Sequence, residues 1–216
     1  TRHATNKPLS HGILMLQTLP CTPTGVQLYA LHLPTPERTA ARNALRQALA
    51  QQLQQYGLTV TPTQISNMRG QAPHIHSAAQ PPYLSFAYEG HWAVCALHPS
   101  RPVGIDLVCI QHSSWQKNPA HWLQLAADYL PPASASHIAH AAPALHMQLF
   151  AQAWAAHEAK LKSLGLALDE WPAYNAPNAL AYTQLQSGFA QLPVAASDDA
   201  GTWALAWALA PMPSPN

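Results

Sequence analysis

Two periods of apolar residues alternate along the chain. Short, dense runs of aliphatic and aromatic residues predict β-strands, at residues 26–33, 84–88, 91–97, 103–108, 181–185 and 202–208. Longer stretches with apolar residues three and four positions apart predict helices at residues 37–56, 118–130 and 144–164. Glycine follows two of these helices, at Gly57 and Gly165, where a helix commonly ends. A turn at Glu89-Gly90 joins two of the strands into a hairpin.

The segments between these runs are rich in Pro, Thr and Ser and are predicted to be loops. They are residues 1–24, 70–83 and 131–143, and the Pro-rich tail 211–216 is predicted to be frayed. The resulting order is strand, helix, hairpin, strand, helices, strands, which indicates an α+β or α/β fold.

Both halves of the chain follow the same coarse order of a strand, a long helix and further strands, although no sequence repeat is visible. We therefore expect a pseudo-duplicated fold of two similar halves. Residues 1–104 would form an N-terminal α/β half that starts with a loop-like segment. Residues 105–216 would form a C-terminal α/β half that ends in the frayed tail.

The composition excludes several classes of protein. The 216-residue chain is 48% hydrophobic, so it can bury a core, and 9% charged, against about 25% in an average soluble domain. Its formal net charge is +1, which gives no basic patch for duplex nucleic acid or for an anionic membrane surface. The low charge also differs from the composition of charge-driven disorder.

The cysteines and the start of the chain bear on location. Cys21, Cys95 and Cys109 have no CxxC spacing, so they predict neither a zinc ribbon nor a secreted disulfide framework. The apolar run 12–16 is too short for a signal peptide or a membrane span. We expect a cytoplasmic protein. Apolar surroundings favour inert thiols at Cys95 and Cys109, although a Cys–His nucleophile stays open.

Two of the nine acidic residues lie where a solvated carboxylate is not expected. Asp106 interrupts the apolar strand 103–108, and Glu158 lies in the middle of the long helix, four residues before Lys162. A carboxylate in an apolar strand is costly unless it is paired or binds a cation, and two converging carboxylates suit Mg²⁺. The alternative is an edge-strand Asp106 facing solvent, with Glu158 and Lys162 as an ordinary surface pair.

These residues carry a resemblance to a known family. Val103-Gly104-Ile105-Asp106 is similar to the (V/I)-G-(I/V)-D-x-E motif of the 4′-phosphopantetheinyl transferases. About fifty residues later, the segment 154–162, with Trp154, Glu158 and Lys162, is similar to the family's W-x-x-K-E-A/S-x-x-K motif. The segment 90–96 resembles the one that follows a Ser-His-Ser triplet in the family.

The resemblance implies a pseudo-dimeric fold with coenzyme A between two similar halves. It implies Mg²⁺ held by Asp106 and Glu158, and transfer of the phosphopantetheine arm to a serine of an acyl or peptidyl carrier protein. Glu158 would take the serine proton, Lys162 would hold phosphate or orient Glu158, and His157 would stand at the family's first lysine.

Four departures from the family pattern are visible. Val108 stands where many members carry an acid, and His157 replaces a lysine. Ala87-Tyr88-Glu89 aligns with the Ser-His-Ser triplet that grips coenzyme A phosphate, and Gly70-Gln71-Ala72-Pro73 replaces a Gly-Lys-Pro loop. The altered triplet, Val108 and His157 support an alternative function, in which catalysis is weakened and the protein is a carrier-protein binding or scaffold module.

Few cations are left to hold the coenzyme A phosphates. The candidates are Arg46, Arg42 and Arg69, with Lys160 as a further one, and Tyr88 stands at the centre of the altered triplet. Arg42 and Arg46 belong to a stripe four residues apart on the first predicted helix, and such a stripe can equally be a solvated face.

The thirteen histidines do not predict a transition-metal site. The nearest sets are His74 and His76, and His137, His140 and His146, and neither has a Cys partner or a His-Glu-x-x-His arrangement. The expected partners are therefore coenzyme A, Mg²⁺ and a carrier protein, with no nucleic acid and no membrane, and we expect a monomer.

Overall fold

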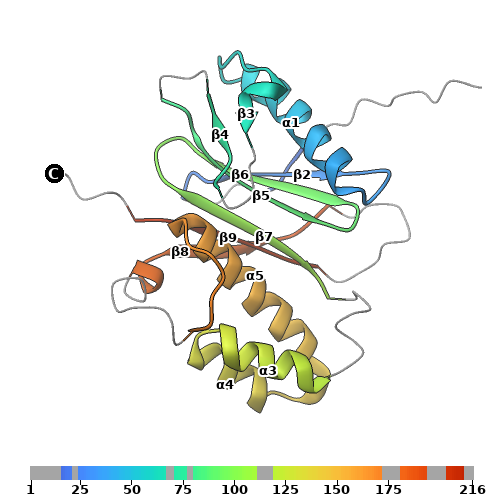
Figure 1. The fold of residues 1–216 in the computed structure, drawn as a ribbon, viewed down its shortest axis with the longest axis vertical. Coiled ribbons are helices and arrows are strands. Elements are labelled where there is room, and N and C mark those ends of the chain that lie inside the picture. Colours follow the sequence, from blue (N-terminus) through green and yellow to red (C-terminus); the bar gives the residue numbers. More distant parts are fainter. Residues whose placement is uncertain are drawn as a thin grey trace, which may run out of the picture.

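The computed structural model describes residues 16–20, 24–66, 71–76, 80–110, 119–171, 181–193 and 203–211. Figure 1 shows the resulting mixture of helices and antiparallel sheets. The helices are α1 (Arg38–Gln54), α3 (Pro119–Tyr129), α4 (Pro132–His140) and α5 (His146–Leu164), with short 3₁₀ turns at Pro62–Gln64 and Pro143–Leu145. The strands are β1 (Gln17–Thr18), β2 (Gln27–His32), β3 (Ile65–Ser66), β4 (His74–Ile75), β5 (Tyr83–Glu89), β6 (Trp92–His98), β7 (Val103–Cys109), β8 (Gln186–Ala190) and β9 (Trp203–Leu209).

Two larger sheets organise the molecule. The first has the order β1-β2-β6-β5 and the second the order β7-β9-β8, and β3 and β4 form a small third sheet. All of the pairings are antiparallel. Strand β7 is an edge strand of the second sheet and packs along β5 of the first, so the two sheets meet at a seam between β5 and β7 (Figure 1).

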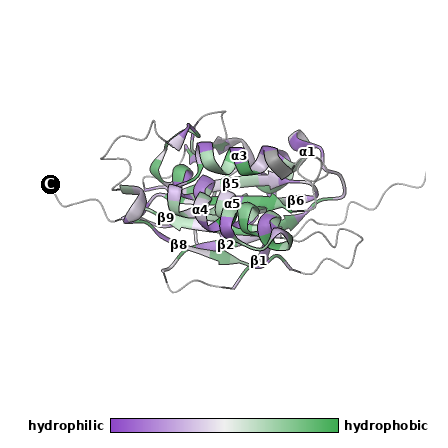
Figure 2. Cartoon of the chain, turned by 90° about the horizontal axis from the view of Figure 1, so that it is seen from below, coloured by the Kyte–Doolittle hydropathy of each residue, from purple (hydrophilic) through white to green (hydrophobic). Residues whose placement is uncertain are grey.

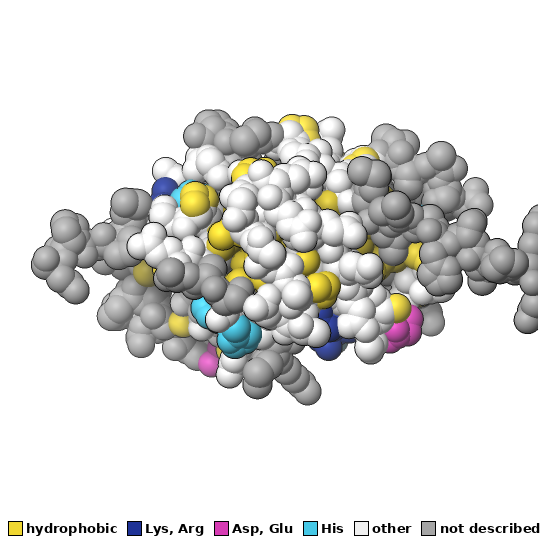
Figure 3. Space-filling view, turned by 90° about the horizontal axis from the view of Figure 1, so that it is seen from above, with side chains coloured by type: hydrophobic (Ala, Val, Ile, Leu, Met, Phe, Trp, Pro, Cys, Tyr) yellow, Lys and Arg dark blue, Asp and Glu magenta, His cyan; other side chains and the backbone are white. Residues whose placement is uncertain are grey.

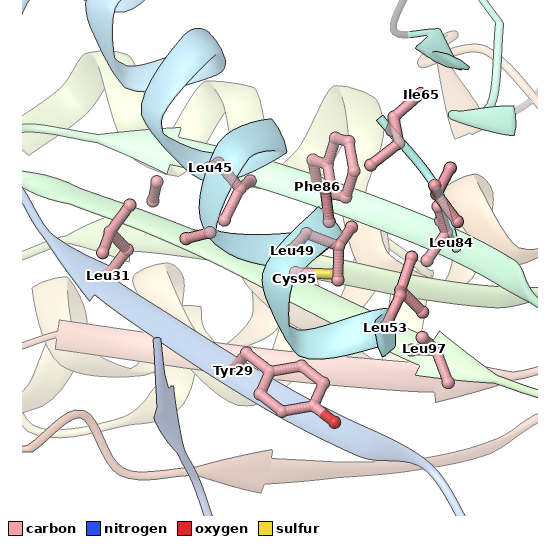
Figure 4. Packing of buried hydrophobic residues seen from close by; sticks show 14 of the residues in the cluster. Tyr29, Leu31, Leu45, Leu49, Leu53, Ile65, Leu84, Phe86, Cys95 and Leu97 are labelled. Atoms are coloured by element: carbon pink, nitrogen blue, oxygen red, sulfur yellow. The ribbon is translucent and has the colours of Figure 1, made fainter. Parts of the chain in front are cut away.

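Each larger sheet carries a helix on one face and shares an apolar core on the other. Helix α1 packs Leu45, Leu49 and Leu53 onto Phe86 and Cys95 of the first sheet (Figure 4). The opposite faces of the two sheets contribute to one common cluster that includes residues of β2, β5, β6, β7 and β9. Helix α5 covers the outer face of the second sheet through a band of alanines. The layers are thus α1, first sheet, second sheet, α5.

The sequence explains where the long helices begin and end. The Glu37 carboxylate accepts hydrogen bonds from the Thr39 and Ala40 amides, which caps the start of α1. Gly57 and Gly165 follow α1 and α5 with φ of 77° and 68°, a left-handed conformation that glycine adopts most easily. Figure 2 shows apolar and polar residues side by side on the helices, as expected where one face of each packs on a sheet.

Most of the predicted elements are confirmed, with shifts of at most two residues at their ends. The predictions for residues 26–33, 84–88, 91–97, 103–108 and 202–208 correspond to β2, β5, β6, β7 and β9. The predicted helices correspond to α1, α3 and α5. The mixed α and β composition is likewise confirmed. The equivalence of the two halves and the boundary at residue 104 stay predictions.

Three predictions of irregular structure and one predicted strand are wrong in the described parts. The segment 131–143 contains helix α4, because Pro132 lies in the first helical turn, where a missing N–H is harmless, and Ile138 is buried. Residues 181–183 are helical, and the strand of this region is β8, which begins at Gln186. The predicted loops 1–24 and 70–83 contain the two-residue strands β1 and β4. The tail 212–216 lies outside the described residues.

The described part of the chain has no helix long and apolar enough to cross a membrane. On the face drawn in Figure 3, the charged side chains are scattered singly and do not gather in a patch. This surface agrees with the scarcity of charge in the sequence.

Candidate active site

Helix α5 approaches strand β7 as closely as backbones allow, because of one glycine. A Cβ added to Gly104 would lie 1.8 Å from the carbonyl oxygen of Ala159 and 2.8 Å from the Ser163 nitrogen. Only a residue without a side chain fits at this crossing. The glycine therefore fixes the distance between α5 and β7, and with it the positions of the polar side chains that both elements carry.

Lys162 reaches from α5 across to β7 and makes two contacts there. Its ammonium lies 2.6 Å from Asp106 Oδ1 and donates a second hydrogen bond to the Ile105 carbonyl oxygen at 3.1 Å. The Asp106 side chain is 14% exposed and the Lys162 side chain is 32% exposed, so the ion pair is partly withdrawn from water. The expectation of a solvent-facing Asp106 and a Glu158–Lys162 surface pair does not describe this arrangement.

Glu158 lies one turn before Lys162 on the same side of α5 and is partly buried. Burial raises the pKa of its carboxyl, the charge of Asp106 raises it further, and Lys162 lowers it. Burial also raises the pKa of Asp106, against the charge and hydrogen bond of Lys162. Both carboxyls thus resist ionisation, because one lysine does not compensate for two buried negative charges. A further cation bound between the two carboxylates would therefore be electrostatically favourable.

The edge of β7 that is not paired with β9 is connected to the first sheet by a side-chain hydrogen bond. The Ile105 amide donates to the hydroxyl of Ser85, a buried residue of β5, at 3.1 Å. The carbonyl of the same residue accepts from Lys162. Ile105 therefore has one contact from each side of the seam, directly beside Asp106.

His157 is fully buried next to the aromatic rings of Tyr182 and Trp171. Its Nδ1 lies 3.0 Å from the Tyr182 hydroxyl, and the Trp171 ring is 6.1 Å away between centroids. Lys160 places its ammonium 4.6 Å from the centre of the Tyr182 ring. Burial, followed by the charge of Lys160, lowers the pKa of His157 to about 4. The imidazole is therefore neutral near pH 7 and does not supply the positive charge of the family lysine.

We expect this burial to make stability depend on pH. A histidine with a lowered folded pKa stabilises the fold fully above its unfolded value of 6.5, and loses that contribution as pH falls towards 4. The shift corresponds to about 3 kcal/mol. The free energy of unfolding of the wild type, relative to His157→Gln, should fall by this order between pH 7 and pH 4 in urea titrations. His137→Gln, at an exposed position, is the control, and an equal pH dependence of wild type and His157→Gln would contradict the assignment.

The other predicted ligand residues lie in the first half of the chain. Arg42 and Arg46 lie on α1 and are partly buried; Arg46 donates to Asn43 Oδ1 at 2.6 Å, and within the described residues Arg42 Nε has no hydrogen-bond partner. Tyr88 lies on β5, on the sheet face covered by α1. Arg69 lies outside the described residues.

Val108 faces α5 two residues beyond Asp106, but it belongs to an apolar cluster with Ala151 and Ala155. The described residues contain no group of three His, Cys, Asp or Glu side chains that could hold a metal ion. Two carboxylates are nevertheless a usual protein share for Mg²⁺, which takes its remaining oxygen ligands from water and substrate phosphates. The raised pKa values of Asp106 and Glu158 are consistent with such a cation, so the donor chemistry fits Mg²⁺.

Two residues of this region escaped the sequence analysis. Ser85 could have been noticed as a hydroxyl inside the apolar run Leu84–Ala87, although many strand serines have no such contact. Tyr182 gave no usable signal, because residues 181–185 were interpreted as a strand and only the three-dimensional fold brings Tyr182 to α5.

A comparison with protein-family models identifies the second half. Residues 102–204 match the model of the 4′-phosphopantetheinyl transferase superfamily. This segment is a domain of that superfamily. The match contains Asp106, Glu158 and Lys162, the three charged residues that the structure brings together. No curated protein matches the chain.

The superfamily domain begins one residue before β7, so the match does not include α1 or β5. The assignments to Arg42, Arg46 and Tyr88 therefore depend on the sequence resemblance alone. Asp106, Glu158 and Lys162 lie inside the matched segment and converge in the structure, and their roles stay predictions.

Proposed function

We propose that the protein transfers the 4′-phosphopantetheine arm of coenzyme A to a serine of an acyl or peptidyl carrier protein, with Mg²⁺. The observation that carries this proposal is the convergence of Asp106, Glu158 and Lys162 at the crossing of β7 and α5. The 4′-phosphopantetheinyl transferase superfamily match over the same residues supports it.

In the proposed reaction, the serine oxygen attacks the phosphorus that carries the pantetheine arm. A new P–O bond forms, the bond to the bridging pyrophosphate oxygen breaks, and 3′,5′-ADP leaves with the electron pair. Asp106 and Glu158 would hold Mg²⁺, which when bound offsets negative charge on the pyrophosphate. The ionised Glu158 carboxylate would accept the serine proton.

Lys162 has a more restricted role in this proposal than the motif alone suggests. An ammonium has three donors, and Lys162 already directs two of them to Asp106 and to the Ile105 carbonyl. The third is available for a phosphate oxygen. Lys162 would therefore orient Asp106 first and contact the substrate with what remains. The coenzyme A phosphates would otherwise rely on Arg42, Arg46 and Arg69, with Tyr88 alongside.

A binding or scaffold role is the second candidate. Val108 and the buried, neutral His157 favour it, since neither supplies the charge found at these positions in the family pattern. Such a module would still bind a carrier protein but would not turn over coenzyme A. Location in the cytoplasm and a monomeric state belong to both candidates.

Calorimetric titration of coenzyme A, with and without Mg²⁺, separates the two candidates. For a transferase we expect binding that requires Mg²⁺ and is lost in Asp106→Asn, a change that keeps an oxygen for Lys162. Mass spectrometry of a carrier protein incubated with coenzyme A then reports the added arm. Carrier-protein binding without Mg²⁺-dependent coenzyme A binding would favour the scaffold role and reject the transferase.

A further inference from the structure

The seam between β5 and β7 places a hydroxyl from the first half of the chain beside the candidate active site. Ser85 is 4% exposed and accepts the Ile105 amide hydrogen at 3.1 Å. It lies on a strand that pairs with β6 and takes no part in the second sheet, so this contact joins two sheets rather than two neighbouring strands.

The Ser85 contact affects the candidate active site because the carbonyl group of Ile105 also takes part in a hydrogen bond. The Ile105 carbonyl accepts a hydrogen bond from Lys162, whose ammonium also holds Asp106. The Ile105 side chain points away from the site and is buried in the core shared by the two sheets. The Ile105 backbone thus links the Ser85 hydroxyl, bound at its amide, to the Lys162–Asp106 pair, bound at its carbonyl, in one chain of contacts.

The edge position of β7 makes this chain necessary. On this side of β7 no described strand donates to or accepts from Ile105, so its amide and carbonyl depend on side chains. A buried amide hydrogen without an acceptor is costly, and the strand would move to find one. A displaced Ile105 would carry its carbonyl, and with it Lys162, away from the present position.

We propose that Ser85 is a positioning residue for the active site, which fixes the Lys162 ammonium on Asp106 through the backbone of Ile105. The proposal rests on the proposed function where it concerns Mg²⁺ and transfer, and on the hydrogen bonds alone where it concerns Lys162. The first half of the chain then contributes to the acidic site directly, in addition to any contacts with coenzyme A.

Ser163 provides a matched control. It is a second buried serine, 3% exposed, and it lies beside Lys162 in α5. Its backbone lies against Gly104 of β7, but its hydroxyl donates to the Lys160 carbonyl of its own helix at 2.8 Å and not to an atom of the seam. Ser85→Ala and Ser163→Ala each remove one buried hydroxyl, and only the first breaks the chain to Lys162.

The first test needs no substrate and no metal. The 216-residue protein is treated with sulfosuccinimidyl acetate, and the acetylation rates of Lys162 and Lys160 are followed by tandem mass spectrometry, with Lys160 as the internal reference. Ser85→Ala should raise the relative rate at Lys162 about fivefold, the factor that one hydrogen bond between neutral groups typically represents. Ser163→Ala should leave the ratio unchanged. An unchanged ratio in Ser85→Ala overturns the proposal.

The second test concerns function. In transfer assays, Ser85→Ala should raise the Mg²⁺ concentration for half-maximal rate about tenfold, as loss of an outer-sphere hydrogen bond often does, with the KM for carrier protein unchanged. Ser163→Ala should keep the wild-type Mg²⁺ dependence, and equal values in both variants would overturn the proposal. If Ser85→Ala does not fold, Ser85→Cys, whose sulfur fills the vacated space as a larger but weaker acceptor, takes its place in both tests. A wild type without transfer activity rejects the proposed function, while the acetylation ratio still decides the role of Ser85.

Discussion

Replacing Glu158 with glutamine is expected to reduce the rate of phosphopantetheine transfer by a factor of about 10² to 10⁴, the usual contribution of a general base. The amide keeps the shape of the side chain but neither accepts the serine proton nor carries charge for Mg²⁺. Stability should move the other way. Glutamine removes a buried carboxyl whose pKa is raised by burial and by Asp106, so the melting temperature at pH 8 should stay equal or increase. Carrier-protein modification and thermal unfolding of the same preparation measure both effects.

The control for this variant is another carboxylate on a helix. Asp128 of α3 is half-buried and accepts an exposed hydrogen bond from Gln124 on the same helix, which packs on α4 and α5. Asp128→Asn changes the net charge equally and should retain the wild-type rate. Wild-type transfer by Glu158→Gln would contradict the role of Glu158 as base. A large fall in the melting temperature of Glu158→Gln would contradict the interpretation that the negative charge of Glu158 is buried without full compensation by Lys162.

The sequence was sufficient to find the two acids of this site. Asp106 stands out because a carboxylate inside an apolar strand is rare, and Glu158 because its surroundings match a motif. Their convergence follows from the fold, since β7 and α5 pack on each other. The local hydrophobic period and the composition were thus enough to predict the strand, the helix and the unusual positions of their charged residues, because these features depend only on residues close in sequence.

What the sequence did not provide depends on contacts between distant residues. The burial of His157 requires Tyr182, which is 25 positions away and lies in a segment interpreted as a strand. Helix α4 was missed because two adjacent prolines suggest a loop, although Pro132 in a first helical turn is compatible with a helix and Ile138 finds an apolar contact. The short-range sequence pattern predicts neither the burial of His157 nor the packing of α4.

Gly104 shows how the two kinds of information combine. The sequence shows Gly104 only as a glycine within a motif and does not indicate why a larger residue would not fit there. In the structure it lies where the α5 backbone touches β7, two residues before Asp106 on the strand and against Ser163, the residue after Lys162 on the helix. The glycine therefore permits the ion pair, since a helix held further from the strand would move the Lys162 ammonium away from the Ile105 carbonyl.

Gly104→Ala should consequently damage both stability and the active site. The new methyl group would meet the Ala159 carbonyl oxygen, a backbone atom that moves only if the helix moves. We expect a loss of about 3 kcal/mol in the free energy of unfolding, at the upper end of overpacking effects, or about 6 to 12 °C in melting temperature. Transfer should fall at temperatures where the variant is still folded, with a higher Mg²⁺ requirement.

Gly188→Ala separates this effect from general crowding of the same sheet. Its added methyl would meet the Trp207 ring at 2.9 Å, a side chain rather than a backbone, on a strand that does not carry the acidic pair. We expect a smaller loss of stability and an unchanged Mg²⁺ requirement. Urea unfolding and Mg²⁺ titrations of transfer on both variants make the comparison. If Gly104→Ala keeps the wild-type stability and Mg²⁺ dependence, the close approach of α5 to β7 is not what positions Lys162 on Asp106.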